Sequence, residues 1–158
     1  MSVLLWLPKT HLLYFYSDNS VEEWMPYELT FTKPVETPDR EQYWNDCCVG
    51  GDIVLNSVLP ALRQRYGELH AVQEDWGWFV WFNKSTVKLA IDVFCENPET
   101  GEFRMHLTSR VSRILFGSTV TDTPELEELR ESIVFALTSW LQHAPTVMRL
   151  NAQYNPAT

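Results

Sequence analysis

Residues 74–110 decide the fold of this chain, and they read EDWGWFVWFNKSTVKLAIDVFCENPETGEFRMHLTSR. Three runs within this segment are rich in the aromatic and β-branched residues that favour strands: Trp76–Phe82, Thr86–Phe94 and Phe103–Arg110. The sequences between them, Asn83–Ser85 and Asn97–Gly101, consist mostly of turn-forming residues. The segment therefore predicts a three-stranded antiparallel meander.

Alternation within the meander assigns its side chains to two faces, because successive residues of a strand point to opposite sides of the sheet. One face is apolar and carries Val87, Leu89, Ile91, Val93, Phe103, Met105 and Leu107. The other face mixes aromatic, charged and polar residues: Phe79, Trp81, Lys88, Asp92, Phe94, Arg104, His106, Thr108 and Arg110. A binding surface, an ordinary solvated face and a catalytic cleft all remain open for this second face.

The N-terminal half of the chain predicts two further strands and one helix. The strands are His11–Tyr16 and Tyr27–Lys33, the latter ended by a proline that cannot donate to a ladder. A helical spacing of apolar residues follows from Asp52, as the N-cap, to Gly67. Pro60 either kinks this helix or lies in its true first turn, with Asn56 or Ser57 then as the cap.

The C-terminal part predicts a connector, a second helix and a tail. Residues 111–120 are the connector. The helix has Thr123 as N-cap and Pro124 at its first position, with acids in the first turn, and it ends by Pro145. Residues 146–158 are expected to be a tail that is ordered only if its apolar residues find a groove.

The predicted element order is therefore ββαβββα, in a single α+β domain spanning residues 1–145. Such an order favours one mostly antiparallel five-stranded sheet with two main helices packed on one face. It resembles the arrangement of longin, roadblock and profilin-like modules, although a shared element order does not transfer function.

Composition narrows the functional classes. The 158 residues are 45% hydrophobic and 21% charged, as in a globular protein, and the net charge is −9. Residues 1–75 carry 12 acids and 5 bases (−7), whereas residues 76–158 carry 9 and 7 (−2). Nucleic-acid binding requires basic residues and is not expected, whereas an acidic protein suits a basic protein partner. Solubility alone also explains an acidic surface.

Three cysteines, two of them adjacent at Cys47 and Cys48, indicate a reducing compartment rather than a disulfide framework. The N-terminus lacks the features of a secretory signal, and no apolar run approaches the ~20 residues of a membrane span. We therefore expect a cytoplasmic protein without membrane contact. The four histidines show no metal-ligand spacing, so neither a metal nor a cofactor is expected.

Residues 34–51 form the least regular stretch, with a turn of helix expected near Arg40–Trp44. Long irregular loops in compact domains are often functional. Aromatic residues beside acids are typical of interface hot spots, although Tyr43 and Trp44 could equally fold back as a lid. The predicted partner-binding residues are Glu36, Asp39, Glu41, Tyr43, Trp44 and Asp46 in the loop, together with Trp81, Arg104 and His106 on the mixed face of the meander.

The motif Glu74–Phe79 and the strand after it, to about Phe94, resemble a group of small bacterial proteins. Some of those proteins belong to the toxin–immunity class. The resemblance implies a catalytically inert protein that binds and blocks a toxin, and it assigns no functional residue. The sequence thus favours a non-enzymatic, immunity-type inhibitor of a cationic toxin domain.

Two other functions remain as alternatives. One is a scaffold or trafficking module that acts through protein–protein contacts and could form a homodimer. The other is a small enzyme that uses His106 as a general base with Asp92 or Glu74.

Overall fold

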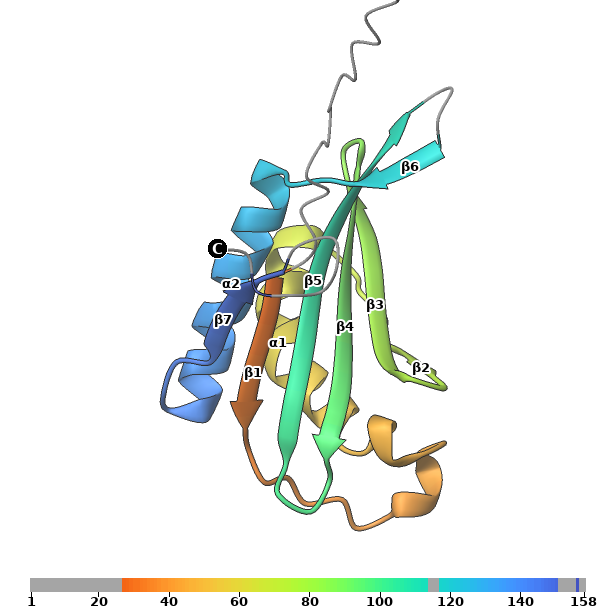
Figure 1. Cartoon of the computed structure of the whole chain (residues 1–158), viewed down its shortest axis with the longest axis vertical. Coiled ribbons are helices and arrows are strands. Elements are labelled where there is room, and N and C mark those ends of the chain that lie inside the picture. The colour runs from red at the N-terminus through yellow and green to blue at the C-terminus, as the bar shows by residue number, and fades with distance from the viewer. Residues whose placement is uncertain (1–26, 114–116, 151–155, 157–158) are drawn as a thin grey trace, which may run out of the picture.

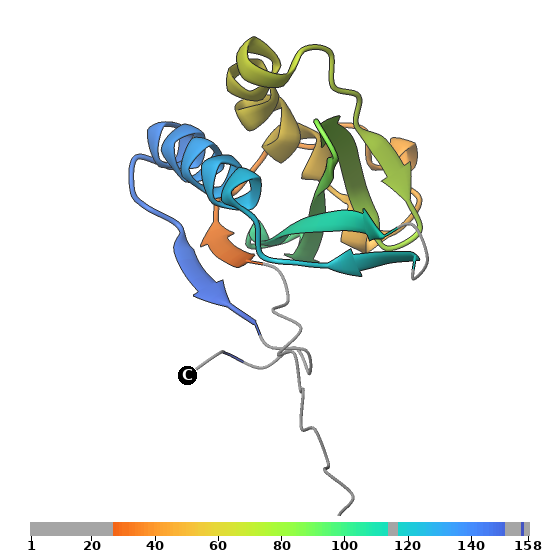
Figure 2. The ribbon, with the colours of Figure 1, turned by 90° about the horizontal axis from the view of Figure 1, so that it is seen from above.

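The protein is an α+β fold in which one antiparallel sheet carries two helices on one of its faces (Figures 1 and 2). The computed structural model describes residues 27–113, 117–150 and 156. The strands are β1 (Tyr27–Thr32), β2 (Val72–Glu74), β3 (Gly77–Lys84), β4 (Val87–Asn97), β5 (Glu102–Arg113), β6 (Gly117–Val120) and β7 (Thr146–Arg149). The helices are α1 (Gly51–Tyr66) and α2 (Pro124–Leu141).

The strand order is β2-β3-β4-β5-β1-β7, and β6 pairs with β5 off this path. The predicted meander is confirmed as β3, β4 and β5, with Asp92 opposite His106 and Val80 opposite Ile91. β1 confirms the predicted strand at residues 27–33 and pairs with β5. The other predicted N-terminal strand, residues 11–16, lies outside the described residues.

The predicted count of five strands and the order ββαβββα are wrong in detail, because three short strands were missed. β2 is three residues long, and its pairing with β3 makes a tight hairpin around Asp75 and Trp76. Residues 111–120 are not a connector, since they contain the end of β5 and the whole of β6. Segments of three or four residues are too short to show a period, so pairing with a longer neighbour makes them strands.

The predicted tail is also wrong for residues 146–149. They form β7, which pairs antiparallel with β1, with Glu28 opposite Met148. The sheet therefore extends past the boundary that the sequence indicated at residue 145.

Helix α1 begins earlier than its predicted caps. Gly50 is the N-cap and has a left-handed backbone (φ 75°), whereas Asp52 lies in the first turn. Pro60 lies inside the helix, so a start near Asn56 or Ser57 is wrong. A side chain on Gly51 would overlap the indole of Trp78, so glycine allows the helix to begin against the sheet.

Helix α2 has the predicted N-terminus. The hydroxyl oxygen of Thr123 accepts a hydrogen bond from the Leu126 amide (3.2 Å), and Pro124 opens the helix. The helix ends at Leu141, before the predicted stop at Pro145, with Gln142 in a left-handed conformation (φ 68°).

The core lies between the two helices and the aliphatic side of the sheet, which we call the helix-covered face. Its fully buried strand residues include Leu29, Leu89, Ile91, Val93, Met105 and Leu107, and its helix residues include Leu55, Leu62, Leu129, Ile133 and Leu137. The predicted assignment of the apolar side chains to one face is confirmed. The opposite side, which neither helix covers, is called the open face below (Figure 2).

Candidate functional site

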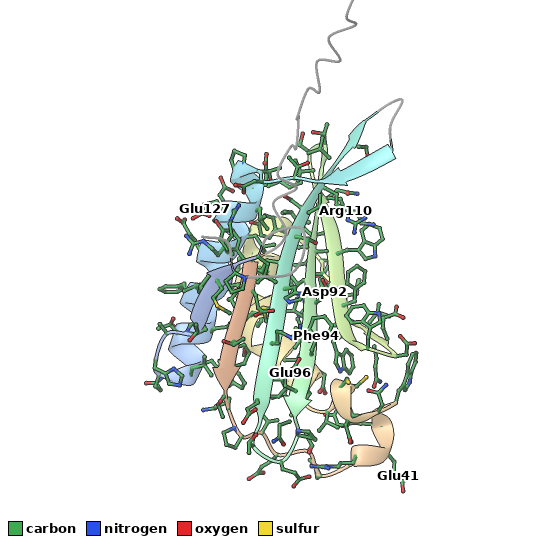
Figure 3. All side chains as sticks on the ribbon, viewed as in Figure 1. Glu41, Asp92, Phe94, Glu96, Arg110 and Glu127 are labelled. Carbon is green, nitrogen blue, oxygen red and sulfur yellow. The ribbon has the colours of Figure 1, made fainter. Side chains whose placement is uncertain are left out.

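The open face carries the mixed set of residues that alternation predicted. Asp92 lies at its centre, because the register sets it opposite Phe79 on β3 and opposite His106 on β5. Figure 3 shows Arg110, Asp92, Phe94 and Glu96 following one another along the sheet towards the end where Glu41 lies. Of the predicted contact residues on this face, Trp81 is 51% exposed, Arg104 is partly exposed and His106 is buried (8% exposed).

Four rings form a continuous aromatic tract on this face: Trp76, Phe79, Phe94 and His106. The Trp76 ring centroid is 5.9 Å from that of Phe79 and 5.4 Å from that of Phe94. The Phe94 and His106 centroids are 5.2 Å apart in an edge-to-face arrangement. Such geometries are favourable for aromatic pairs, so the tract is a firmly packed part of the open face.

Two cations of the open face already lie over aromatic rings. The Arg104 guanidinium carbon is 4.8 Å from the Phe94 centroid, and the Lys88 Nζ is 4.2 Å from the Trp81 ring. Arg104 also donates to Glu96 (Nε to Oε1, 2.7 Å) and lies 3.8 Å from Glu28. The rings of this face are therefore placed to bind positive charge.

His106 is held by Glu28, with 2.8 Å between Nε2 and Oε2. Burial lowers the pKa of His106, and this effect outweighs the opposing influence of Glu28. The imidazole is consequently neutral at neutral pH and donates its Nε2 proton to the carboxylate. Sequence reasoning missed Glu28, since it lies on β1 and only the β1–β5 register sets it opposite His106.

Asp92 differs from the other acids of the open face. Burial raises the pKa of Asp92 to about 6, and Arg110 opposes this shift only in part. Among the described residues, no hydrogen bond or ion pair reaches its carboxylate. The open face thus contains a partly buried carboxylate without a protein partner among the described residues, and burial disfavours its ionised form.

The enzyme alternative requires a base and a group for it to activate. His106 and Asp92 are opposite one another in register, but the hydrogen bond of His106 goes to Glu28, and Glu74 pairs with Gly77 at the edge of the sheet. Burial raises the pKa of Cys95 to about 11 and also raises that of Cys48, so these thiols are protonated. Both are buried away from the open face.

The loop 34–50 packs against the ends of two hairpins. Its backbone donates from Trp44 to the Gln73 side chain (2.9 Å), and Asn45 donates to the Asp75 carbonyl. On its other side Arg40 forms an ion pair with Glu99 in the β4–β5 turn (3.0 Å). The predicted helical turn is present as a short 3-10 turn, Arg40–Gln42, followed by a second one at Asp46–Cys48.

This packing brings acids from three separate segments to one end of the molecule. We call this group the acidic end; its members are the exposed residues Glu36, Asp39, Glu41, Asp46, Asp75, Glu96, Glu99 and Glu102. Sequence reasoning found the four acids of the loop and missed those of the two hairpins. The turn signal at residues 97–101 could have indicated exposure, but only the packing of the loop shows that the hairpin acids lie near it.

The two aromatic residues of the loop have opposite environments. Trp44 is 65% exposed, whereas Tyr43 is 7% exposed and its hydroxyl donates to Asp52 in α1 (2.9 Å). Burial, reinforced by Asp52, raises the pKa of Tyr43 to about 12. Of the two alternatives that the sequence left open, folding back fits the buried Tyr43 and exposure fits Trp44, so Trp44 is the one of the pair that is accessible to a partner.

Comparisons of the chain with family models, curated proteins and solved structures found no match. Within the described residues, no group of three or more metal-ligating side chains could hold a metal ion. Neither α1 nor α2 has the length and apolarity that crossing a membrane requires.

Proposed function

We propose that the protein is a non-enzymatic, acidic binding protein, an immunity-type inhibitor that binds and neutralises a cationic toxin domain through its acidic end. One observation carries this proposal: the exposed indole of Trp44 lies in a loop that packs against two hairpins, and this packing brings exposed carboxylates from three segments to the same end of the molecule. Exposed tryptophan is a frequent hot-spot residue, and surrounding acids favour encounter with a basic protein.

The loop is held in place before any partner arrives. The Trp44 amide bonds Gln73, the Gln73 side chain donates back to the Gln42 carbonyl (3.2 Å), and Tyr43 fixes the loop to α1. Binding therefore costs little ordering of the loop, which supports affinity as well as encounter rate. Six of the eight acids are also available, because among the described residues no ion pair is formed by Glu36, Asp39, Glu41, Asp46, Asp75 or Glu102.

The first experiment is capture of the partner with the tagged chain at low salt, followed by a wash at about 0.5 M salt, where the screening length falls to a few Å. A single basic protein that the salt wash weakens is the expected result. A self-associated dimer that is insensitive to salt would contradict the inhibitor and favour the scaffold alternative.

A charge-reversal variant then tests the surface itself. Glu36→Lys, Glu41→Lys and Asp46→Lys together should lower the association rate constant at low salt by about ten-fold or more. The control variant, Glu68→Lys, Glu125→Lys and Glu131→Lys, changes the net charge equally but in α2 and in the segment after α1. Equal losses in the two variants would show that net charge matters and the acidic end does not.

A further inference from the structure

The Asp92 carboxylate is the least explained charged group of the described structure. It lies at the centre of the open face, is partly buried, and receives no hydrogen bond or ion pair from the described residues. Its oxygens are not among the fully buried, unpartnered side-chain atoms of the described residues, so water reaches them. A partner that displaces this water must supply a hydrogen bond in its place. A ligand that donates hydrogen bonds to the Asp92 carboxylate would account for the lack of a protein partner in the isolated chain.

The surroundings of Asp92 are aromatic. Phe79 lies directly opposite it on β3, His106 directly opposite on β5, and Phe94 two residues further along β4 on the same face. Through Phe94 these rings join Trp76, whose neighbour Asp75 belongs to the acidic end. A carboxylate beside ring faces is the combination that binds organic cations.

The charged neighbours of Asp92 are occupied or distant. On β5, Arg104 is bound to Glu96 and Glu28, and His106 donates to Glu28. On β4, Lys88 lies over the Trp81 ring. The remaining cation is Arg110, four residues beyond His106 on β5. Arg110 lowers the pKa of Asp92 but forms no ion pair with it in the described structure. β3 contributes Phe79, Trp81 and Asn83 to this face and no charge.

We propose that Asp92, with Phe79 and Phe94, binds an arginine side chain of the protein partner. The proposal rests on the proposed function for the existence of a basic partner, and it adds a second contact on the open face. Arginine is the expected cation because its planar guanidinium stacks on rings while donating two parallel hydrogen bonds to a carboxylate. The Arg104 guanidinium carbon lies 4.8 Å from the Phe94 centroid, so this ring already attracts a guanidinium group within the chain.

The site is continuous with the acidic end. Asp92, Phe94 and Glu96 follow one another along β4 towards that end (Figure 3). Trp76, which contacts Phe94, and its neighbour Asp75 lie in the β2–β3 turn. A basic partner that the acidic end attracts is therefore able to reach Asp92 with one side chain. The acidic end then governs association, and Asp92 governs dissociation.

The direct test uses N-acetyl-arginine methylamide as the probe and N-acetyl-citrulline methylamide as its neutral isostere. Carbon-detected NMR follows the Asp92 carboxylate as pH is varied. The arginine probe should lower the pKa of Asp92 by about half a unit or more, because a bound cation favours the ionised form. Equal shifts with both probes, or no shift with either, would overturn the proposal.

Variants locate the probe site. Asp92→Asn should weaken binding of the arginine probe by about ten-fold or more, as expected when a charge-assisted hydrogen bond is lost. The Glu36→Lys, Glu41→Lys and Asp46→Lys variant should still bind the probe at the open face. Undiminished binding to Asp92→Asn, with shifts confined to the acidic end, would overturn the inference.

Binding kinetics with the captured partner separate the proposed contact at Asp92 from the proposed binding surface at the acidic end. Asp92→Asn should raise the dissociation rate constant of the complex about ten-fold and leave its association rate nearly unchanged. An unchanged dissociation rate would overturn the Asp92 contact and leave the acidic end as the binding surface. If no basic partner is captured, the proposed function fails, and the probe titration still decides whether Asp92 binds guanidinium groups.

Discussion

The two faces of β4 differ in what their side chains do. Leu89, Ile91 and Val93 on the helix-covered face are fully buried against the helices. On the open face, Lys88, Asp92 and Phe94 alternate with them along the same strand. The first set stabilises the fold through removal of apolar surface from water, whereas the second holds charges beside aromatic rings. One strand thus combines a structural face with a recognition face.

The largest effect should come from a change on the helix-covered face. Leu107 is fully buried, so Leu107→Ala should lower the free energy of unfolding by about 3 kcal/mol through lost burial and a cavity. Its neighbour Thr108 points to the open face, and Thr108→Ala should change stability by less than about 0.5 kcal/mol. Urea denaturation of both variants measures the difference. Similar losses would mean that something also packs tightly against the open face at this position.

A smaller effect of opposite sign is expected at Asp92. The pKa is about 6 in the folded chain against an ordinary value of 3.8, so between these pH values the folded state binds more protons than the unfolded state. Titration of Asp92 therefore lowers the free energy of unfolding of the protein as pH rises from about 4 to about 6. Asp92→Asn should stabilise the protein by about 2 kcal/mol at pH 8, with the gain vanishing below about pH 4.

Denaturation of Asp92→Asn and the wild-type chain across this pH range measures the effect, and Glu41→Gln is the control for removal of one exposed negative charge. A stabilised Asp92→Asn that also loses the arginine probe would show that this carboxylate favours binding at the expense of stability. A variant less stable than the wild type at pH 8 would show that Asp92 is paired in solution.

The smallest effects concern the loop, where a buried and an exposed aromatic residue are adjacent. Tyr43→Phe removes the hydrogen bond to Asp52 and should cost about 1 kcal/mol of unfolding free energy. Trp44→Ala should cost less than about 0.5 kcal/mol, since the indole is mostly exposed, yet it should weaken partner binding markedly. Thermal denaturation and binding assays on both variants test this division. A binding loss confined to Tyr43→Phe would reverse the roles assigned to them.

Much of the fold followed from local patterns. Composition predicted β3, alternation predicted β4, β5 and the membership of both faces, and the Thr123–Pro124 pair predicted the start of α2. The start of α1 did not follow, because Gly51 must accommodate the Trp78 indole, a contact between distant residues. β7 was missed for a similar reason, since its four residues become a strand only by pairing with β1.

The candidate site divides in the same way. The sequence by itself determined that Asp92 and His106 share a face, that the loop is acidic, and that the chain carries net negative charge. Only the tertiary structure decided that Glu28, 78 residues away, is hydrogen-bonded to His106. It also decided that Tyr43 is buried while Trp44 is exposed, and that acids of the hairpins lie near the acids of the loop. Periodicity records which side of a strand a residue occupies, whereas its partners depend on which strands pair and how loops pack across them.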